Sequence, residues 1–179
     1  MAALADEPPD PRIAAAAAGD RAAAETLCRE LLPRVRNLVR YLLRGDGRVD
    51  DVAQEALIAV LRGLGSFRGE GRFESWVDRV VARTAFAIIK RIRAETQPGE
   101  VEAVDTEART DSYAERREVA AALDQLSPEQ REALVLHFAV GMTVPEIAEE
   151  LGAPFETVRS RLRLGKAALR EALGGRDAL

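Results

Sequence analysis

The segment 143–173 has the start, crossing, turn and buried positions that a helix-turn-helix motif requires. Thr143 and Glu146 have the spacing of a capping box at the start of a helix. Gly152 stands where the chain needs a left-handed residue to leave that helix, and the small Ala148 stands where a second helix must cross closely. The segment therefore predicts two short crossed helices.

The second helix of this motif is predicted to open at Pro154. Its apolar positions recur at helical spacing and form a buried stripe of Val158, Leu162, Leu169 and Leu173. Cationic side chains lie about 100° further round the helix. In such motifs the N-terminal part of the second helix enters the major groove. The residues expected to contact duplex DNA are Thr157, Arg159, Ser160, Arg161, Arg163 and Lys166. The alternative is a helical hairpin with a solvated basic face.

The composition of the chain favours an all-α fold. Its 179 residues are 47% hydrophobic but only 4% aromatic, and alanine, leucine, arginine and glutamate are frequent. The formal net charge of −4 at pH 7 is unusual for a protein that binds DNA alone, because phosphate contacts depend on lysine and arginine. We therefore expect weak DNA binding without a partner.

The rare residues exclude several classes of site. With Cys28 as the single cysteine, no internal disulfide or cysteine metal cluster forms, and we expect a packed thiol. His137, the single histidine, is expected to be packed or partly exposed rather than catalytic. Asp50, Asp51 and Glu55 supply too few ligands for Mg²⁺. We expect no catalytic residues, no cofactor and no metal.

No targeting segment is apparent. The alanine-rich stretch 14–18 is broken at once by glycine and aspartate, so it is neither a signal peptide nor a membrane span. We expect the protein to stay in the cytoplasm without membrane contact of its own.

The predicted organisation is two small helical domains joined by a flexible acidic linker. Helix signals at 11–19, 20–44, 49–64 and 73–94 place the first domain at residues 1–94. Residues 95–112 are polar and acidic, which is typical of a linker. Helices at 113–126 and 128–141 then lead into the helix-turn-helix, so the second domain is 113–179.

An acidic surface is predicted on the helix 49–64. Asp51, Gln54, Glu55 and Ile58 lie three or four residues apart and share one face. An acidic face with an exposed isoleucine suits a basic protein partner, although a solvated helix face is the simpler interpretation.

The loop before residue 73 and the helix after it combine cations with aromatic rings. The residues that suit unstacked single-stranded bases are Arg68, Arg72, Phe73, Trp76, Arg79, Arg83 and Lys90. In the alternative interpretation the rings belong to the core and the cations are solvated.

These runs resemble a known family. Segments 50–57, 66–70 and 73–76 resemble the second domain of bacterial RNA polymerase sigma factors of the extracytoplasmic-function group. Segments 126–131, 146–152 and 157–162 are similar to the fourth domain of the same group. The resemblance covers nearly the whole chain, in order and at the right separations.

The resemblance implies a role for each surface. Asp51, Gln54, Glu55 and Ile58 correspond to the surface that docks on the coiled coil of the largest polymerase subunit. The cationic and aromatic set corresponds to the element that captures an extruded base of the −10 promoter element and holds the melted strand. The helix from Pro154 corresponds to the reader of the −35 element in duplex DNA. The acidic linker corresponds to the segment in the RNA exit channel.

The family also implies partners. These are core RNA polymerase, through its largest and second-largest subunits, promoter DNA, and an anti-sigma protein that holds the chain inactive. The main rival is a helix-turn-helix regulator that binds DNA independently of polymerase.

The sequence departs from the family pattern at three places. Arg83 stands where many relatives have asparagine, and Ala87 replaces a second polar residue. Leu164 and Gly165 replace a frequent Arg-Ala pair, which predicts fewer phosphate contacts and a weakened helix. Ala153 replaces the usual hydroxyl cap before the second helix.

Overall fold

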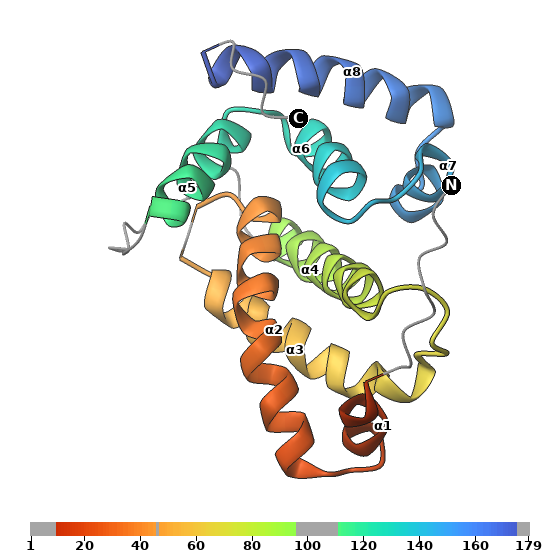
Figure 1. Cartoon of the computed structure of the whole chain (residues 1–179). Helices are drawn as coiled ribbons and strands as arrows, with labels where there is room; N and C mark the ends of the chain where they lie inside the picture. The colour runs from red at the N-terminus through yellow and green to blue at the C-terminus, as the bar shows by residue number, and fades with distance from the viewer. Residues whose placement is uncertain (1–9, 46, 96–110, 175–179) are drawn as a thin grey trace, which may run out of the picture.

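The computed structural model describes residues 10–45, 47–95 and 111–174, and these form helices with no strand among them (Figure 1). The all-α fold class is therefore confirmed for the described residues. The elements are α1 Pro11–Ala17, α2 Arg21–Leu42, α3 Val49–Gly63, the 3₁₀ turn η1 Leu64–Ser66, α4 Phe73–Glu95, α5 Asp111–Asp124, α6 Pro128–Leu134, the π-helical turn η2 Val135–Ala139, α7 Val144–Leu151 and α8 Phe155–Ala172.

Side-chain caps begin several of these helices where the sequence predicts. The Asp20 carboxylate accepts a hydrogen bond from the backbone N–H of Ala23 at 2.9 Å. At the start of α6, Ser127 and Gln130 exchange two hydrogen bonds of 3.3 Å, which is the reciprocal pattern of a capping box. Pro33 lies inside α2 without ending it.

Helices α1 to α4 bury a shared apolar core. Val35 and Val39 of α2, Val60 of α3 and Val77 of α4 belong to this cluster, and all four are almost fully buried. A partly buried ion pair joins two of these helices. The Asp78 carboxylate, in a residue only 4% exposed, accepts hydrogen bonds of 2.7 and 2.5 Å from Arg34, which ties α4 to α2.

Helices α5 to α8 form the second unit, in which α7 and α8 are the predicted helix-turn-helix. Gly152 ends α7 with φ of 59° and ψ of 34°, the left-handed conformation that lets the chain turn. The buried stripe of α8 is confirmed at Val158, Leu169 and Leu173, whereas Leu162 is half-buried. Pro154 is the N-cap of α8 rather than its first helical residue.

Gly165 does not interrupt α8, which continues to Ala172. Gly165 is buried, and a Cβ atom at this position would lie 3.2 Å from Cβ of Gln130 and 3.2 Å from Cδ1 of Leu134. The absence of a side chain lets α8 pack closely on α6.

The two units contact each other. Arg44, just after α2, donates from Nη2 and Nε to the backbone carbonyl of Asp124 at 2.7 and 3.2 Å. Buried side chains of both units belong to the same apolar cluster, and Figure 1 shows α4 beneath α6 and α7, with α8 on the far side of the second unit.

The predicted linker is shorter at both ends than residues 95–112. Helix α4 extends through Glu95, and α5 already begins at Asp111. The remaining residues, 96–110, lie outside the described part of the chain.

Candidate nucleic-acid and protein interfaces

The residues of α8 that were predicted to contact DNA divide into two groups. Arg159, Ser160 and Arg163 are exposed, as contact with a groove requires. Thr157, Arg161 and Lys166 are half-buried along the sides of the helix. The first turns of α8 thus present a polar and cationic surface whose apolar side lies on α6 and α7.

Two cations of α8 lie against aromatic rings that the sequence analysis did not single out. The guanidinium carbon of Arg159 is 5.9 Å from the centroid of Phe155, and Nζ of Lys166 is 5.6 Å from the centroid of Phe138. Nη1 of Arg159 also lies 3.2 and 3.4 Å from the carboxylate oxygens of Glu156. The spacing of four residues between Phe155 and Arg159 on one helix was the available signal.

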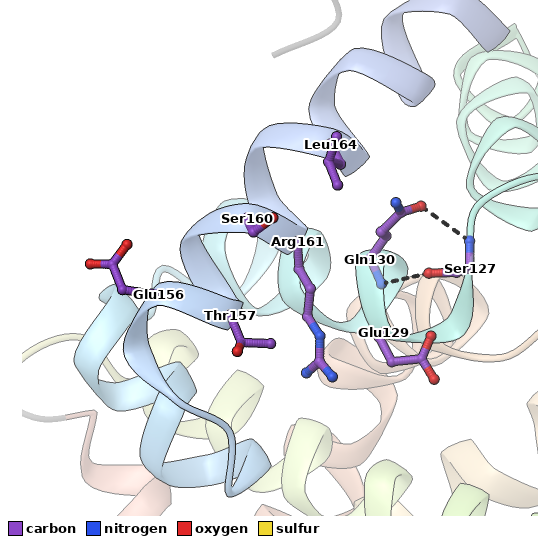
Figure 2. A pocket seen from close by; sticks show the side chains of 8 residues that line it. All are labelled: Ser127, Glu129, Gln130, Glu156, Thr157, Ser160, Arg161 and Leu164. Carbon is purple, nitrogen blue, oxygen red and sulfur yellow. Dashed lines mark hydrogen bonds between the residues drawn. The ribbon is translucent and has the colours of Figure 1, made fainter.

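A groove of about 610 Å³ runs between the first turns of α8 and the start of α6 (Figure 2). Figure 2 shows Arg161 and Leu164 of α8 on the side of that helix nearer Gln130 of α6. The lining residues are Ser127, Glu129, Gln130, Glu156, Thr157, Ser160, Arg161 and Leu164. Three of the predicted DNA-contacting residues therefore share one concave surface with the capping box of α6.

Three rings gather at the end of α3 and the start of α4. Phe67, Phe73 and Trp76 have centroid separations of 5.2, 5.6 and 5.8 Å, with Phe73 and Trp76 stacked. All three are half-buried against the core, and Trp76 covers Gly63, where a Cβ atom would lie 3.3 Å from its ring. The rings are thus partly core and partly accessible, which combines the two interpretations of the sequence.

The cations predicted to hold the melted strand are exposed, and two of them pair with the second unit. Arg79 Nη2 lies 3.0 Å from Glu146, and Arg83 Nε lies 2.9 Å from Glu150. Both carboxylates belong to α7, the first helix of the helix-turn-helix. Arg68, Arg72 and Lys90 are exposed, with Arg72 Nε 3.5 Å from Glu74.

Sequence reasoning missed these pairs, because no local pattern links residues that are 67 positions apart. The acidic side chains of α7 at 146 and 150 do have the one-turn spacing that matches arginines at 79 and 83. This matched spacing of opposite charges on two helices was the signal that could have identified the pairs.

Glu146 serves two purposes at this contact. Its Oε2 accepts hydrogen bonds of 2.8 Å from both the backbone N–H and the hydroxyl of Thr143. The Thr143 N–H, the Thr143 hydroxyl and then Arg79 hold the pKa of Glu146 below its usual value. The carboxylate is therefore charged at neutral pH, where it caps α7 and faces α4 at once.

The predicted acidic face of α3 is present. Asp51, Gln54 and Glu55 are exposed and Ile58 is 40% exposed, whereas the core side of the helix is formed by Val52, Ala53, Ala56 and Val60. Arg91 of α4 approaches Glu55 only at 3.8 Å. Asp50, next to this face, pairs with Arg36 at 2.7 Å. The surface keeps an acidic centre with one apolar side chain.

The single cysteine and the single histidine are both half-buried. Cys28 is half-buried, and burial raises the pKa of its thiol. The Nδ1 atom of His137 lies 2.9 Å from the carbonyl oxygen of Met142 and the residue is half-buried, as predicted.

Among the described residues no cluster of His, Cys, Asp and Glu could hold a metal ion. None of the helices in that part of the chain is both long and apolar enough to cross a membrane.

Comparison with protein families gives two matches in order along the chain. Residues 27–96 match the family described as Sigma-70 region 2, and residues 116–169 match Sigma-70, region 4. The first match spans α2 to α4 with the ring cluster and the acidic face. The second spans most of α5 to α8, including the helix-turn-helix.

Curated proteins similar to this chain include two RNA polymerase sigma factors. The chain is 32% identical over 162 residues to the ECF RNA polymerase sigma factor SigM of Mycobacterium tuberculosis, covering 90% of this chain and 83% of that protein. It is 29% identical over 170 residues to the RNA polymerase sigma-H factor of Pseudomonas aeruginosa, covering 87% and 88%.

Solved structures with a similar fold include CnrH in complex with the cytosolic domain of CnrY, with a TM-score of 0.55 and 25% identity over 93% of this chain and 97% of that chain. The sigma factor RpoE of Bartonella quintana, crystallised with the anti-sigma factor NepR, has a TM-score of 0.64 at 22% identity and covers 86% and 98%.

Proposed function

The chain belongs to the extracytoplasmic-function group of RNA polymerase sigma factors, and from this membership we propose which partner each of its surfaces binds. It is an alternative sigma factor that binds core RNA polymerase and directs it to particular promoters for transcription initiation. The observation that carries the proposal is the pair of region matches in order, each on a unit with the surface that its task requires. We assign the unit that ends with α4 at Glu95 to docking and melting, and the unit that begins with α5 at Asp111 to the upstream element.

The acidic face of α3 is proposed to bind the largest subunit of core polymerase. Asp51, Gln54 and Glu55 are exposed, and Ile58, which is 40% exposed, adds an apolar contact. A carboxylate cluster with one apolar side chain suits a basic helical partner surface.

The ring cluster and the cations of α4 are proposed to hold the melted −10 strand. Phe73 and Trp76 keep part of their faces accessible beside Arg68 and Arg72, and base stacking on such rings needs no paired duplex. Arg79, Arg83 and Lys90 continue the cationic surface along α4.

The first turns of α8 are proposed to read the −35 element in the major groove. Arg159, Ser160 and Arg163 are exposed there, and Thr157, Arg161 and Lys166 border them. The formal net charge of −4 limits affinity for free DNA, so core polymerase is needed to bring both promoter elements within reach.

The contacts between the two units of the free chain also indicate that core polymerase is needed for DNA binding. Arg79 and Arg83 contact Glu146 and Glu150 of α7, so single-stranded DNA has to compete for these cations. Binding to polymerase is proposed to separate the two units. We further propose that the protein catalyses no reaction itself, acts in the cytoplasm with its polymerase, and is held inactive by an anti-sigma protein. The similar CnrH was solved bound to the cytosolic domain of another protein.

Run-off transcription with core polymerase on a genomic library tests this function. We expect Asp51→Ala/Glu55→Ala to lose core binding in a pull-down, whereas Glu25→Ala/Glu171→Ala, two exposed acids elsewhere, keeps it. Arg159→Ala/Arg163→Ala should bind core but lose promoter choice. Arg29→Ala/Arg62→Ala, which removes two exposed arginines of the first unit, serves as the control.

Two results would overturn the assignment. One is failure of the purified chain to bind core polymerase after every inhibitor is removed. The other is tight binding of duplex promoter DNA at physiological salt without polymerase, since that behaviour belongs to an independent helix-turn-helix regulator.

A further inference from the structure

Phe155, the first residue of α8, leaves a large apolar ring in solvent. The residue is 45% exposed and does not belong to the apolar cluster that holds the rest of the helix-turn-helix together. Single exposed apolar side chains are common on protein surfaces, so exposure alone carries no inference. The inference depends instead on the position of the ring at the start of α8.

The ring lies at the end of α8 that enters the major groove in helix-turn-helix proteins. One turn further on, the Arg159 guanidinium carbon is 5.9 Å from its centroid, and Glu156 holds the same guanidinium at 3.2 and 3.4 Å. The aromatic ring, the carboxylate and the cation therefore form one exposed cluster. Wherever Arg159 is placed against a base pair, the ring is placed beside it.

The chemistry of the major groove restricts what an apolar ring can recognise there. Base edges present hydrogen-bond donors and acceptors, and the C5 methyl of thymine is the one apolar group among them. Phenylalanine offers no hydrogen bond in return, so contact with a donor or acceptor leaves that group without a partner. A thymine methyl is therefore the group that the ring fits.

We propose that Phe155 contacts the C5 methyl of a thymine in the upstream promoter element, next to the base pair that Arg159 contacts. The proposal rests on the function proposed above, since it requires α8 to read duplex DNA. Phe155 is then a specificity-determining residue that favours A·T over G·C at one position. Burial of one methyl group corresponds to an about fourfold change in affinity.

Phe138 provides a matched control. It is the same residue type, is also 45% exposed, and also carries a cation of α8 over its ring, with Lys166 Nζ at 5.6 Å. It differs in lying on η2 rather than on α8. Comparison of Phe138→Ala with Phe155→Ala therefore separates the effect of losing any exposed ring from the effect of losing the ring at the start of α8.

The experiment uses the full chain with core polymerase on a promoter recovered from the genomic run-off library. Each thymine of the upstream element, on both strands, is replaced singly by deoxyuridine, which removes only the methyl group. We expect one position at which the change weakens complex formation by about fourfold for the wild type. Phe155→Ala should bind the unmodified promoter about fourfold more weakly and show no further loss with deoxyuridine at that position. Phe138→Ala should keep the methyl dependence.

A second template tests the same contact in the opposite direction. When the identified A·T pair is changed to G·C, binding should fall, and 5-methylcytosine on the strand that carried the thymine should recover part of it for the wild type alone. The circular dichroism spectrum of Phe155→Ala should match that of the wild type, because the substituted residue is exposed.

The outcomes separate this proposal from the general function. Absence of promoter-directed transcription on every template overturns the sigma factor assignment itself. Normal transcription with no methyl-dependent position overturns only the role of Phe155. The same holds if Phe155→Ala keeps the wild-type methyl dependence while binding core polymerase more weakly, because the ring then contacts a protein.

Discussion

The Arg83 guanidinium donates from Nε to Oε2 of Glu150 at 2.9 Å, which joins the helix proposed to hold melted DNA to the first helix of the helix-turn-helix. Together with the 3.0 Å pair between Arg79 and Glu146, this contact sets α4 against α7. Two of the cations that should receive the DNA strand, Arg79 and Arg83, are therefore occupied within the free chain. Closure and DNA binding compete for the same side chains.

Reversal of one charge at this contact is expected to open the chain. Glu150→Lys replaces attraction to Arg83 by repulsion, and an exposed pair contributes up to about 1 kcal/mol, or about fivefold in the ratio of closed to open forms. Energy transfer between dyes on Arg62→Cys and Glu171→Cys, with Cys28→Ser, should fall relative to the parent. Added salt should lower the parent's transfer in the same direction.

Glu149→Lys is the control for this change, because Glu149 is exposed on the same helix and the substitution makes the same change of charge while the pair of Arg83 with Glu150 stays in place. Equal transfer for Glu150→Lys and the parent at every salt concentration would contradict the role of the pair.

Acid is expected to weaken the contact at Glu146. The pKa of this group is lowered in the folded chain, so its contribution to stability is complete above the ordinary value of 4.5 and disappears as the pH falls through the lower folded value. The thermal midpoint should drop more steeply below pH 4.5 for the wild type than for Glu146→Gln. Glutamine can keep the capping box but has no charge to lose. Parallel curves for the two proteins would show that Glu146 does not contribute in this range.

Gly165→Val is expected to destabilise the second unit by about 1–3 kcal/mol, since the added side chain meets Gln130 and Leu134 of α6. Intrinsic helix propensity alone predicts the opposite sign, because glycine is the poorer helix former by several tenths of a kcal/mol. Ala167→Val, at an exposed position of α8, should cost only about 0.5 kcal/mol. Urea unfolding monitored by circular dichroism measures both. A stabilised Gly165→Val would disprove the close crossing of α6 and α8.

Arg34→Met is expected to destabilise the first unit by about 1–3 kcal/mol, because it leaves the buried Asp78 carboxylate without its two hydrogen bonds. Arg36→Met should cost less, since its pair with Asp50 is exposed at both ends. The double variant Arg34→Met/Asp78→Leu should recover much of the loss because no buried charge remains. Urea unfolding of the three variants tests this order, and equal losses for Arg34→Met and Arg36→Met would contradict it.

Much of the fold could be predicted because its determinants are local. The capping pair of Ser127 and Gln130 spans three residues, and Gly152 ends α7 through its own left-handed conformation. The acidic face of α3 likewise follows from spacing along one helix. The candidate DNA-contacting residues of α8 were accessible to the same reasoning, but Phe155 was not, because its exposure depends on which sides of α8 the other helices cover.

The amino-acid sequence by itself determined the capped starts of several helices, the turn at Gly152, the apolar face of α8, and the family that the chain resembles, since all of these depend on residues a few positions apart. Only the tertiary structure decided that Asp78 is buried against Arg34, that Gly165 is a crossing point, and that Arg83 pairs with Glu150. These features arise where segments distant along the chain meet, and the interaction energy of such contacts depends on geometry and burial that no local pattern encodes.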